Sequence, residues 1–252
     1  MAVSPINRQK IAAHRGLSGV CPENTMLAFE AARQASVQGL ETDVCMLKDE
    51  TLIIFHDKVQ GRTVTGDKPV DEAVWADFAD KDAGLWRGQD FAGQKVPRLA
   101  ELLVWAARHS VSVNLEVKCH GGRQARTADR LAAALRHTST DDIVISSFDL
   151  SVLQALRELM PEQRLASIHE EMPEDLHRLK DSLEVEAVHL DHQLITSPDD
   201  VAGFHQHGFA VRAWTVNEAP RADQLLRWGV DMVMSDYPER LLAAAGVSQS
   251  CG

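Results

Sequence analysis

Cysteine is scarce in this chain and follows no metal-binding or disulfide pattern. The four cysteines among 252 residues, Cys21, Cys45, Cys119 and Cys251, include no Cys-x-x-Cys pair. Closely spaced cysteine pairs are typical of zinc sites, and dense cysteines of small secreted proteins held together by disulfides. We therefore expect neither a thiolate-bound metal nor disulfide bonds.

Long apolar runs are also missing. No window approaches the roughly 20 apolar residues that a membrane-spanning helix needs. The first residues, MAVSPINRQKIAAHRG, contain no apolar segment of the kind that signal peptides carry, and Met1 is retained. These absences predict a cytoplasmic protein without stable membrane association.

Basic charge is in deficit. Lys and Arg together number 26 against 37 Asp and Glu, which gives a formal net charge of -11. Nonspecific nucleic-acid binding and binding to anionic membranes rely on clustered basic residues, so we expect no nucleic-acid partner. A polyanionic small molecule stays compatible with this composition if a bound cation reverses the local charge.

Apolar strand-like segments alternate with helix-like segments along nearly the whole chain. The spacing predicts strands at residues 10–13, 40–47, 52–55, 111–117, 143–145, 164–168, 187–190, 209–216 and 230–234. It predicts helices at residues 25–38, 99–109, 125–136, 150–159, 175–182, 218–228 and 239–245, and one that begins at Ser197. Eight units of this kind, with apolar strands, favour a parallel sheet covered by helices.

The best interpretation is therefore a single-domain (β/α)8 TIM barrel that spans residues 1–252. The alternation fails at residues 58–96, where several glycines and Trp75 and Trp86 occur. This stretch is too apolar for a disordered linker, so we interpret it as an ordered insertion. A doubly wound open sheet is the main alternative, but no strand is followed by Gly-x-Gly-x-x-Gly.

Acidic residues lie inside two of the predicted strands. Glu41 and Asp43 are two residues apart and thus on one face of their strand, and Glu116 lies in the next barrel strand. Barrel enzymes place their chemistry at the carboxyl ends of the strands. Three carboxylates converging there would repel one another unless a divalent cation held them. Oxygen ligands alone favour one Mg²⁺ or Ca²⁺ ion.

Basic and aromatic groups accompany these acids. His14 and Arg15 end the first strand, Lys118 follows Glu116, and Trp214 lies in a later strand. Each also has a purely structural explanation: Lys118 can form an ion pair with Glu116, and His14 and Trp214 can belong to the core. Their joint placement at strand ends favours a functional interpretation.

An ordered series of motifs resembles the glycerophosphodiester phosphodiesterase family, and most closely its short cytoplasmic bacterial members. The motifs are His14-Arg15-Gly16, Pro22-Glu23-Asn24-Thr25, Glu41-Thr42-Asp43-Val44, His56-Asp57, Asn114-Leu115-Glu116-Val117-Lys118, Ala213-Trp214-Thr215-Val216-Asn217 and Ser235-Asp236-Tyr237-Pro238. His-Arg-Gly or His-Asp alone would be a weak signal, but the series spans nearly the whole chain in order. Ser235 departs from the usual Thr, and Cys45-Met46 from a more polar pair.

The resemblance implies a TIM barrel with a small insertion after the second barrel strand. It implies hydrolysis of glycerophosphodiesters, such as glycerophosphocholine and glycerophosphoethanolamine, to sn-glycerol 3-phosphate and an alcohol. The implied residues are His14 and His56 for acid–base catalysis, Glu41, Asp43 and Glu116 for the metal, Arg15 and Lys118 for phosphate, and Trp214 for the wall of the substrate pocket.

Other functions compete with this interpretation. A metal-dependent sugar isomerase or aldolase barrel would also carry acids and histidines at strand ends, but His14-Arg15 and Glu116-x-Lys118 suit a phosphate better. A non-catalytic binder of a phosphodiester headgroup would not need two acid–base groups. A secreted phospholipase D is disfavoured because paired cysteines and a signal sequence are missing. The sequence leaves open whether the chain forms a homo-oligomer and whether Mg²⁺ or Ca²⁺ is preferred. It also leaves open which of His14 and His56 is the acid, and whether water attacks directly or the glycerol 2-hydroxyl first closes a cyclic phosphate.

Overall fold

Eight parallel strands form a closed ring within the part of the chain that the computed structural model describes, residues 8–136 and 142–244. In ring order they are β1 (Ile11–His14), β2 (Gly39–Met46), β4 (Ser112–Lys118), β5 (Ile143–Ser147), β6 (Arg164–His169), β7 (Ala187–Asp191), β8 (Ala210–Trp214) and β9 (Met232–Ser235). Pairing of β1 with both β2 and β9 closes the ring. The predicted (β/α)8 barrel is confirmed.

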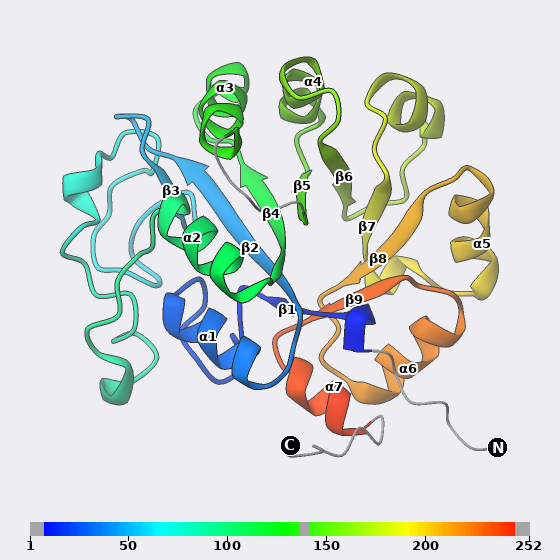
Figure 1. The fold of residues 1–252 in the computed structure, drawn as a ribbon, viewed down its shortest axis with the longest axis horizontal. Coiled ribbons are helices and arrows are strands. Elements are labelled where there is room, and N and C mark those ends of the chain that lie inside the picture. Colours follow the sequence, from blue (N-terminus) through cyan, green and yellow to red (C-terminus); the bar gives the residue numbers. More distant parts are fainter. Residues whose placement is uncertain (1–7, 137–141, 245–252) are drawn as a thin grey trace.

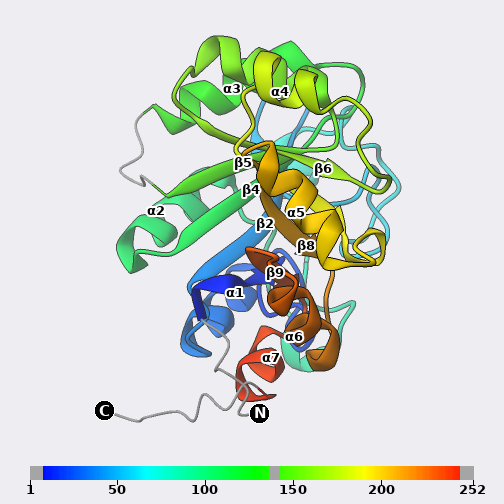
Figure 2. The ribbon, with the colours of Figure 1, turned by 90° about the vertical axis from the view of Figure 1, so that its right-hand side faces the viewer.

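Helices cover the outside of this ring (Figure 1). They are α1 (Met26–Gln34), α2 (Leu99–His109), α3 (Gln124–Leu135), α4 (Leu150–Leu159), α5 (Pro198–Gln206), α6 (Ala219–Arg227) and α7 (Pro238–Ala244). In the second view, α3 and α4 lie on one side of the strands and α6 and α7 on the opposite side (Figure 2). Thr25 caps α1 through a bond from the Ala28 amide.

The helix predicted at residues 175–182 forms. Residues 176–182 are helical, and the last five of them make up the π-helix η4 (Arg178–Ser182). The Asp175 carboxylate accepts a bond from the Arg178 amide at 2.9 Å, so Asp175 stands at the start of the helix. The predicted end of the last helix, Ala245, lies outside the described residues.

A ninth strand lies outside the ring. β3 (Leu52–Ile54) runs antiparallel to the end of β2, with Val44 opposite Ile54. After β3 the chain follows an irregular path with two short turns, η2 (Trp75–Asp77) and η3 (Gln89–Phe91), beside β2 and α2 (Figure 1). The strand predicted at residues 52–55 therefore forms, as a hairpin arm outside the barrel.

The segment after β3 has its own apolar core. Phe55, Val70, Phe78 and Val96 are buried together, and the rings of Phe55 and Phe78 meet edge to face at 5.2 Å. The main core fills the space between ring and helices and includes Phe29, Leu102 and Leu131 among its fully buried side chains. The ordered character expected for residues 58–96 follows from this second core, because a linker would not bury aromatic rings.

The described cysteines, Cys21, Cys45 and Cys119, are free thiols, whereas Cys251 lies outside the described residues. Within the same described ranges, no helix is both long and apolar enough to cross a membrane.

Candidate active site

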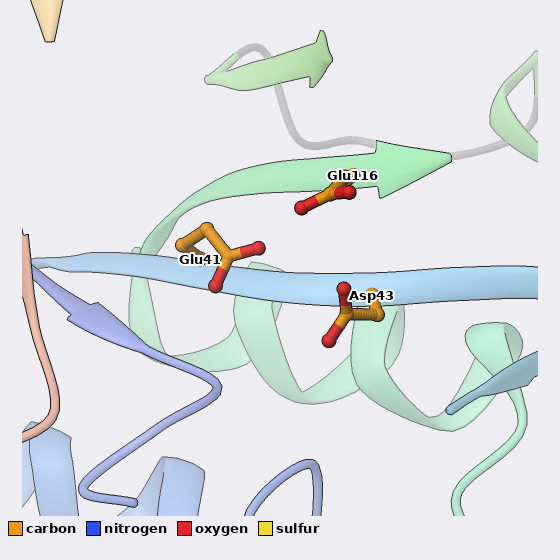
Figure 3. A group of neighbouring side chains, drawn as sticks. All are labelled: Glu41, Asp43 and Glu116. Atoms are coloured by element: carbon orange, nitrogen blue, oxygen red, sulfur yellow. The ribbon is translucent and has the colours of Figure 1, made fainter. Parts of the chain in front are cut away.

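Three carboxylates converge between two neighbouring strands of the ring. Glu41 and Asp43 project from the same face of β2, and Glu116 projects from β4, where it pairs in register with Asp43. Their carboxylates share the space between the strands (Figure 3). One oxygen from each lies within 4.8 Å of the others, and all three residues are buried. The cluster predicted from strand periodicity is therefore present.

Burial and mutual repulsion perturb these acids. Burial raises the pKa of Glu41 to about 8, with further contributions from the Asp43 and Glu116 charges and opposition from His14. Burial and the Asp43 charge likewise raise the pKa of Glu116, although Lys118 opposes them. Burial also disfavours the Asp43 anion, but Arg15 and Lys118 outweigh it and lower that pKa.

The donor set fits a hard divalent cation. Glu41 Oε1 is buried and accepts no hydrogen bond from any described residue. Among the described residues, Asp43 Oδ1 and Glu116 Oε1 are close to a single cationic group, the Lys118 ammonium. Leaving buried anionic oxygens so poorly paired is costly unless a cation completes the site. Oxygen donors without nitrogen or sulfur suit Mg²⁺ or Ca²⁺.

Two basic side chains lie against Asp43. Arg15 Nε is 3.2 Å from Asp43 Oδ2 and Lys118 Nζ is 3.4 Å from Asp43 Oδ1. The side-chain amide of Asn24 donates to Asp43 Oδ2 at 2.8 Å. Both cations face the cavity, so they can bind a phosphate while they neutralise the acids.

His14 is oriented by a carboxylate from the other side of the ring closure. Its Nδ1 lies 2.7 Å from Asp236 Oδ1, just beyond β9, and its Nε2 lies 3.9 Å from Glu41 Oε2. Burial lowers the pKa of His14, but the bond to Asp236 and the Glu41 charge outweigh it, so the net shift is upward. His14 therefore presents Nε2 to the cavity and favours its protonated form.

His56 reaches the same rim by a different route. It follows β3, which returns antiparallel along β2, and the amide of Phe55 bonds to the Asp43 carbonyl at 3.1 Å. Its Nδ1 lies 2.8 Å from Asp57 Oδ1. His56 is thus carried by the hairpin and not by a barrel strand.

An ion-pair chain connects the two sides of the rim. Arg62 donates to Asp57 through Nε at 2.8 Å and to Glu23 through Nη1 at 2.7 Å, and Arg15 Nη1 donates to Glu23 at 2.9 Å. Asp57 in turn contacts His56. The chain fixes Arg15 and His56 relative to each other.

A cavity of about 140 Å³ opens at the carboxyl ends of the strands. Of the eight residues predicted for the site, Asp43 is fully buried and does not line the cavity, and the other seven line it: His14, Arg15, Glu41, His56, Glu116, Lys118 and Trp214. Trp214 meets Phe148 edge to face at 5.6 Å, so the two rings form one wall.

Sequence reasoning missed several supporting residues. Asp236 and Asp57, the partners of the two histidines, stand in motifs that the sequence displayed, as does Asn24. No role could be assigned to them, because partners such as Asp236 and His14 are 222 residues apart and only the closed ring brings them together. His189 and Asn114 also line the cavity and had no role in the prediction.

Comparison with known proteins agrees with this geometry. The sequence model of the glycerophosphoryl diester phosphodiesterase family matches residues 14–240. A glycerophosphodiester phosphodiesterase of Caldanaerobacter subterraneus is 29% identical over 236 residues, which cover 92% of this chain and 96% of the relative. One from Bacillus subtilis is 28% identical over 246 residues, covering 90% of this chain and 83% of the relative.

Among solved structures, an Oleispira antarctica phosphodiesterase in complex with the product sn-glycerol-3-phosphate superposes with a TM-score of 0.89. It is 29% identical, and the match covers 95% of this chain and 97% of that one. The family expected from the motifs is thereby confirmed, and with it the enzyme class. This chain belongs to the glycerophosphoryl diester phosphodiesterase family.

Proposed function

We propose that this chain hydrolyses glycerophosphodiesters, such as glycerophosphocholine and glycerophosphoethanolamine, to sn-glycerol 3-phosphate and an alcohol. His14 and His56 act as the acid–base pair around one Mg²⁺ or Ca²⁺ ion. The observation that carries the proposal is the placement of two histidines, each held at Nδ1 by a carboxylate, beside a buried group of three acids. The sn-glycerol-3-phosphate bound to the Oleispira relative supports the substrate class.

Hydrolysis of a phosphodiester requires one proton to leave the nucleophile and another to reach the departing alcohol. Asp236 and Asp57 occupy Nδ1 of His14 and His56, which leaves Nε2 of each ring for these transfers. His14, whose pKa is raised, suits the acid, and His56 suits the base. The attacking oxygen is either water or the 2-hydroxyl of the glycerol group.

The remaining residues of the site bind the substrate and neutralise the negative charge on its phosphoryl group. Arg15 and Lys118 bind its oxygens, and Trp214 with Phe148 walls the substrate. Glu41, Asp43 and Glu116 hold the cation. When bound, that ion stabilises the negative charge that develops on the phosphoryl oxygens.

Release of sn-glycerol 3-phosphate from glycerophosphocholine, measured with and without EDTA, tests the proposal. We expect release that EDTA abolishes and that Mg²⁺ or Ca²⁺ restores. His14→Ala and His56→Ala should each lower kcat by about 10²- to 10⁴-fold. His205→Ala is the matched control, because His205 also contacts an aspartate, Asp231 at 2.9 Å, but lies outside the cavity lining.

Other outcomes separate the alternatives. No release with any divalent cation would favour a headgroup binder or an isomerase, and full activity of the two histidine variants would remove the acid–base assignment. A cytoplasmic location without stable membrane association stays a prediction from the sequence.

A further inference from the structure

His189 occupies an unusual position inside the barrel. It lies in the middle of β7, is 1% exposed, and lines the same cavity as His14 and Trp214. Its Nε2 lies 3.4 Å from Nη1 of Arg212, which lines a second cavity at the opposite, amino-terminal end of the strands. A guanidinium group can only donate, so Nε2 accepts and Nδ1 carries the ring proton.

The Nδ1 donor of His189 has no partner among the described residues. Burial, first of all, lowers the pKa of His189 far below its usual range, so the ring is neutral and keeps this single N–H group. A buried donor without an acceptor destabilises the fold, a cost that an apolar side chain of similar size would avoid. Arg212 does not account for the histidine, since Glu186 already accepts from it at 3.1 Å.

Asn114 supplies the complementary group. It is 7% exposed, lies on β4 and lines the same cavity. Its Nδ2 donates to Ser146 Oγ at 2.9 Å, which leaves Oδ1 as an acceptor with no partner in the described chain. Besides Glu41 and Trp214, two residues that line the cavity therefore carry a buried unpaired donor, His189 Nδ1, and a buried unpaired acceptor, Asn114 Oδ1. A hydroxyl group can satisfy such a pair.

We infer that His189 and Asn114 recognise the terminal hydroxyl of the glycerol group. This inference rests on the proposed function. The glycerol group is common to all glycerophosphodiesters, whereas the alcohol varies, and a cavity of about 140 Å³ closed by the barrel interior suits the invariant group. With phosphate held by Arg15 and Lys118, the hydroxyl farthest from phosphorus enters deepest. A site that leaves buried polar groups unpaired rejects substrates lacking the hydroxyl.

Paired substrates test the inference. One is a glycerophosphodiester, and the other carries the same alcohol but has propane-1,2-diol in place of glycerol, so it lacks only the terminal hydroxyl. We expect kcat/KM of the wild-type enzyme to be about 10- to 100-fold lower for the second substrate. Equal kcat/KM values would overturn the inference.

Two substitutions separate recognition from a structural role. His189→Asn keeps a donor near the position of Nδ1 but loses the contact with Arg212, whereas His189→Gln keeps an acceptor towards Arg212 and loses the donor. We expect His189→Asn to retain the discrimination between the substrates and His189→Gln to lose it. The reverse order, or equal losses on both substrates, would assign His189 to packing against Arg212.

A binding measurement keeps this test independent of turnover. The thermal stabilisation of the wild-type protein by sn-glycerol 3-phosphate is compared with that by propane-1,2-diol 1-phosphate. We expect the first to bind about tenfold or more tightly, and His189→Gln to remove the difference. If neither diester is hydrolysed but this difference remains, the proposed function fails and the hydroxyl site stands. Equal binding of both ligands would remove the hydroxyl site.

Discussion

His14 and Asp236 form a histidine–carboxylate pair across the closure of the barrel, with Nδ1 2.7 Å from Oδ1. Ser18 donates to the same carboxylate at 2.9 Å and Asn217 at 2.8 Å, so Asp236 is itself held in place. The pair fixes which nitrogen of His14 faces the cavity. Burial disfavours the Asp236 anion, but the bond from His14 outweighs it and holds the pKa of Asp236 near 2, so the carboxylate stays ionised around neutral pH.

Asp236→Asn should change the pH profile as well as the rate. The bond to Asp236 raises the pKa of His14 against the effect of burial, so its loss lowers that pKa. If protonated His14 is the acid, the alkaline limb of the kcat/KM profile moves to lower pH. Misorientation of the ring should also lower kcat by about a hundredfold. Initial rates across the pH range measure both effects.

Ser18→Ala provides the control for this substitution. It removes one donor to Asp236 but keeps the contact with His14, so the limb should move much less. Movement of the acidic limb in Asp236→Asn would instead make His14 the base. A profile unchanged in shape would show that Asp236 does not act through His14.

Cation binding should release protons in a pH-dependent way. In the ion-free protein, burial first, then the charges of Asp43 and Glu116, raise the pKa of Glu41 to about 8, so its carboxyl is mostly protonated at neutral pH. A cation binds the ionised form. Below pH 8 we therefore expect Mg²⁺ or Ca²⁺ affinity to rise with pH by up to about tenfold per unit and then to level off. Calorimetry in buffers of different ionisation enthalpy counts the protons.

The raised pKa of Glu41 also determines how the stability of the ion-free protein changes with pH. A carboxyl whose pKa is higher in the folded than in the unfolded state stabilises the fold at low pH and ceases to do so as pH rises through the folded value. The ion-free protein should therefore lose stability between about pH 4.5 and 8, and the cation should raise Tm more at pH 8 than at pH 6. Glu41→Gln should reduce the proton release. Affinity independent of pH in this window would contradict the assignment.

The sequence predicted the ring well because local pattern and tertiary environment agree there. A barrel strand is buried on both faces, so β4 and β7 appear as apolar runs, and an acid such as Glu116 inside such a run is a strong signal. The segment at residues 175–182 was also predicted correctly, because its apolar spacing is helical and Asp175 stands at its start. The sequence did not indicate that residues 178–182 adopt the wider π-helical form.

The site was predicted less completely than the ring. Glu41 and Asp43 share a face by strand periodicity alone, so their proximity needed no structure. The position of His56 could not be derived in this way, because it depends on β3 turning back along β2. His189 gives no local signal at all: a histidine in an apolar strand looks the same whether its free nitrogen faces a cavity or the core.

The hairpin and its aromatic core should position His56. Phe55, which precedes His56, packs against Phe78 at 5.2 Å, and both are buried. Phe78→Ala should cost about 3–5 kcal/mol of stability, because the cavity it leaves cannot collapse fully. At temperatures below the Tm of the variant, kcat should still fall by about tenfold or more as His56 loses its fixed position.

Phe204→Ala on α5 is the matched control, since Phe204 is buried in the main core away from the cavity lining. It should lose similar stability and keep its kcat. Equal kcat values for the two variants would show that the second core stabilises the fold without positioning the histidine.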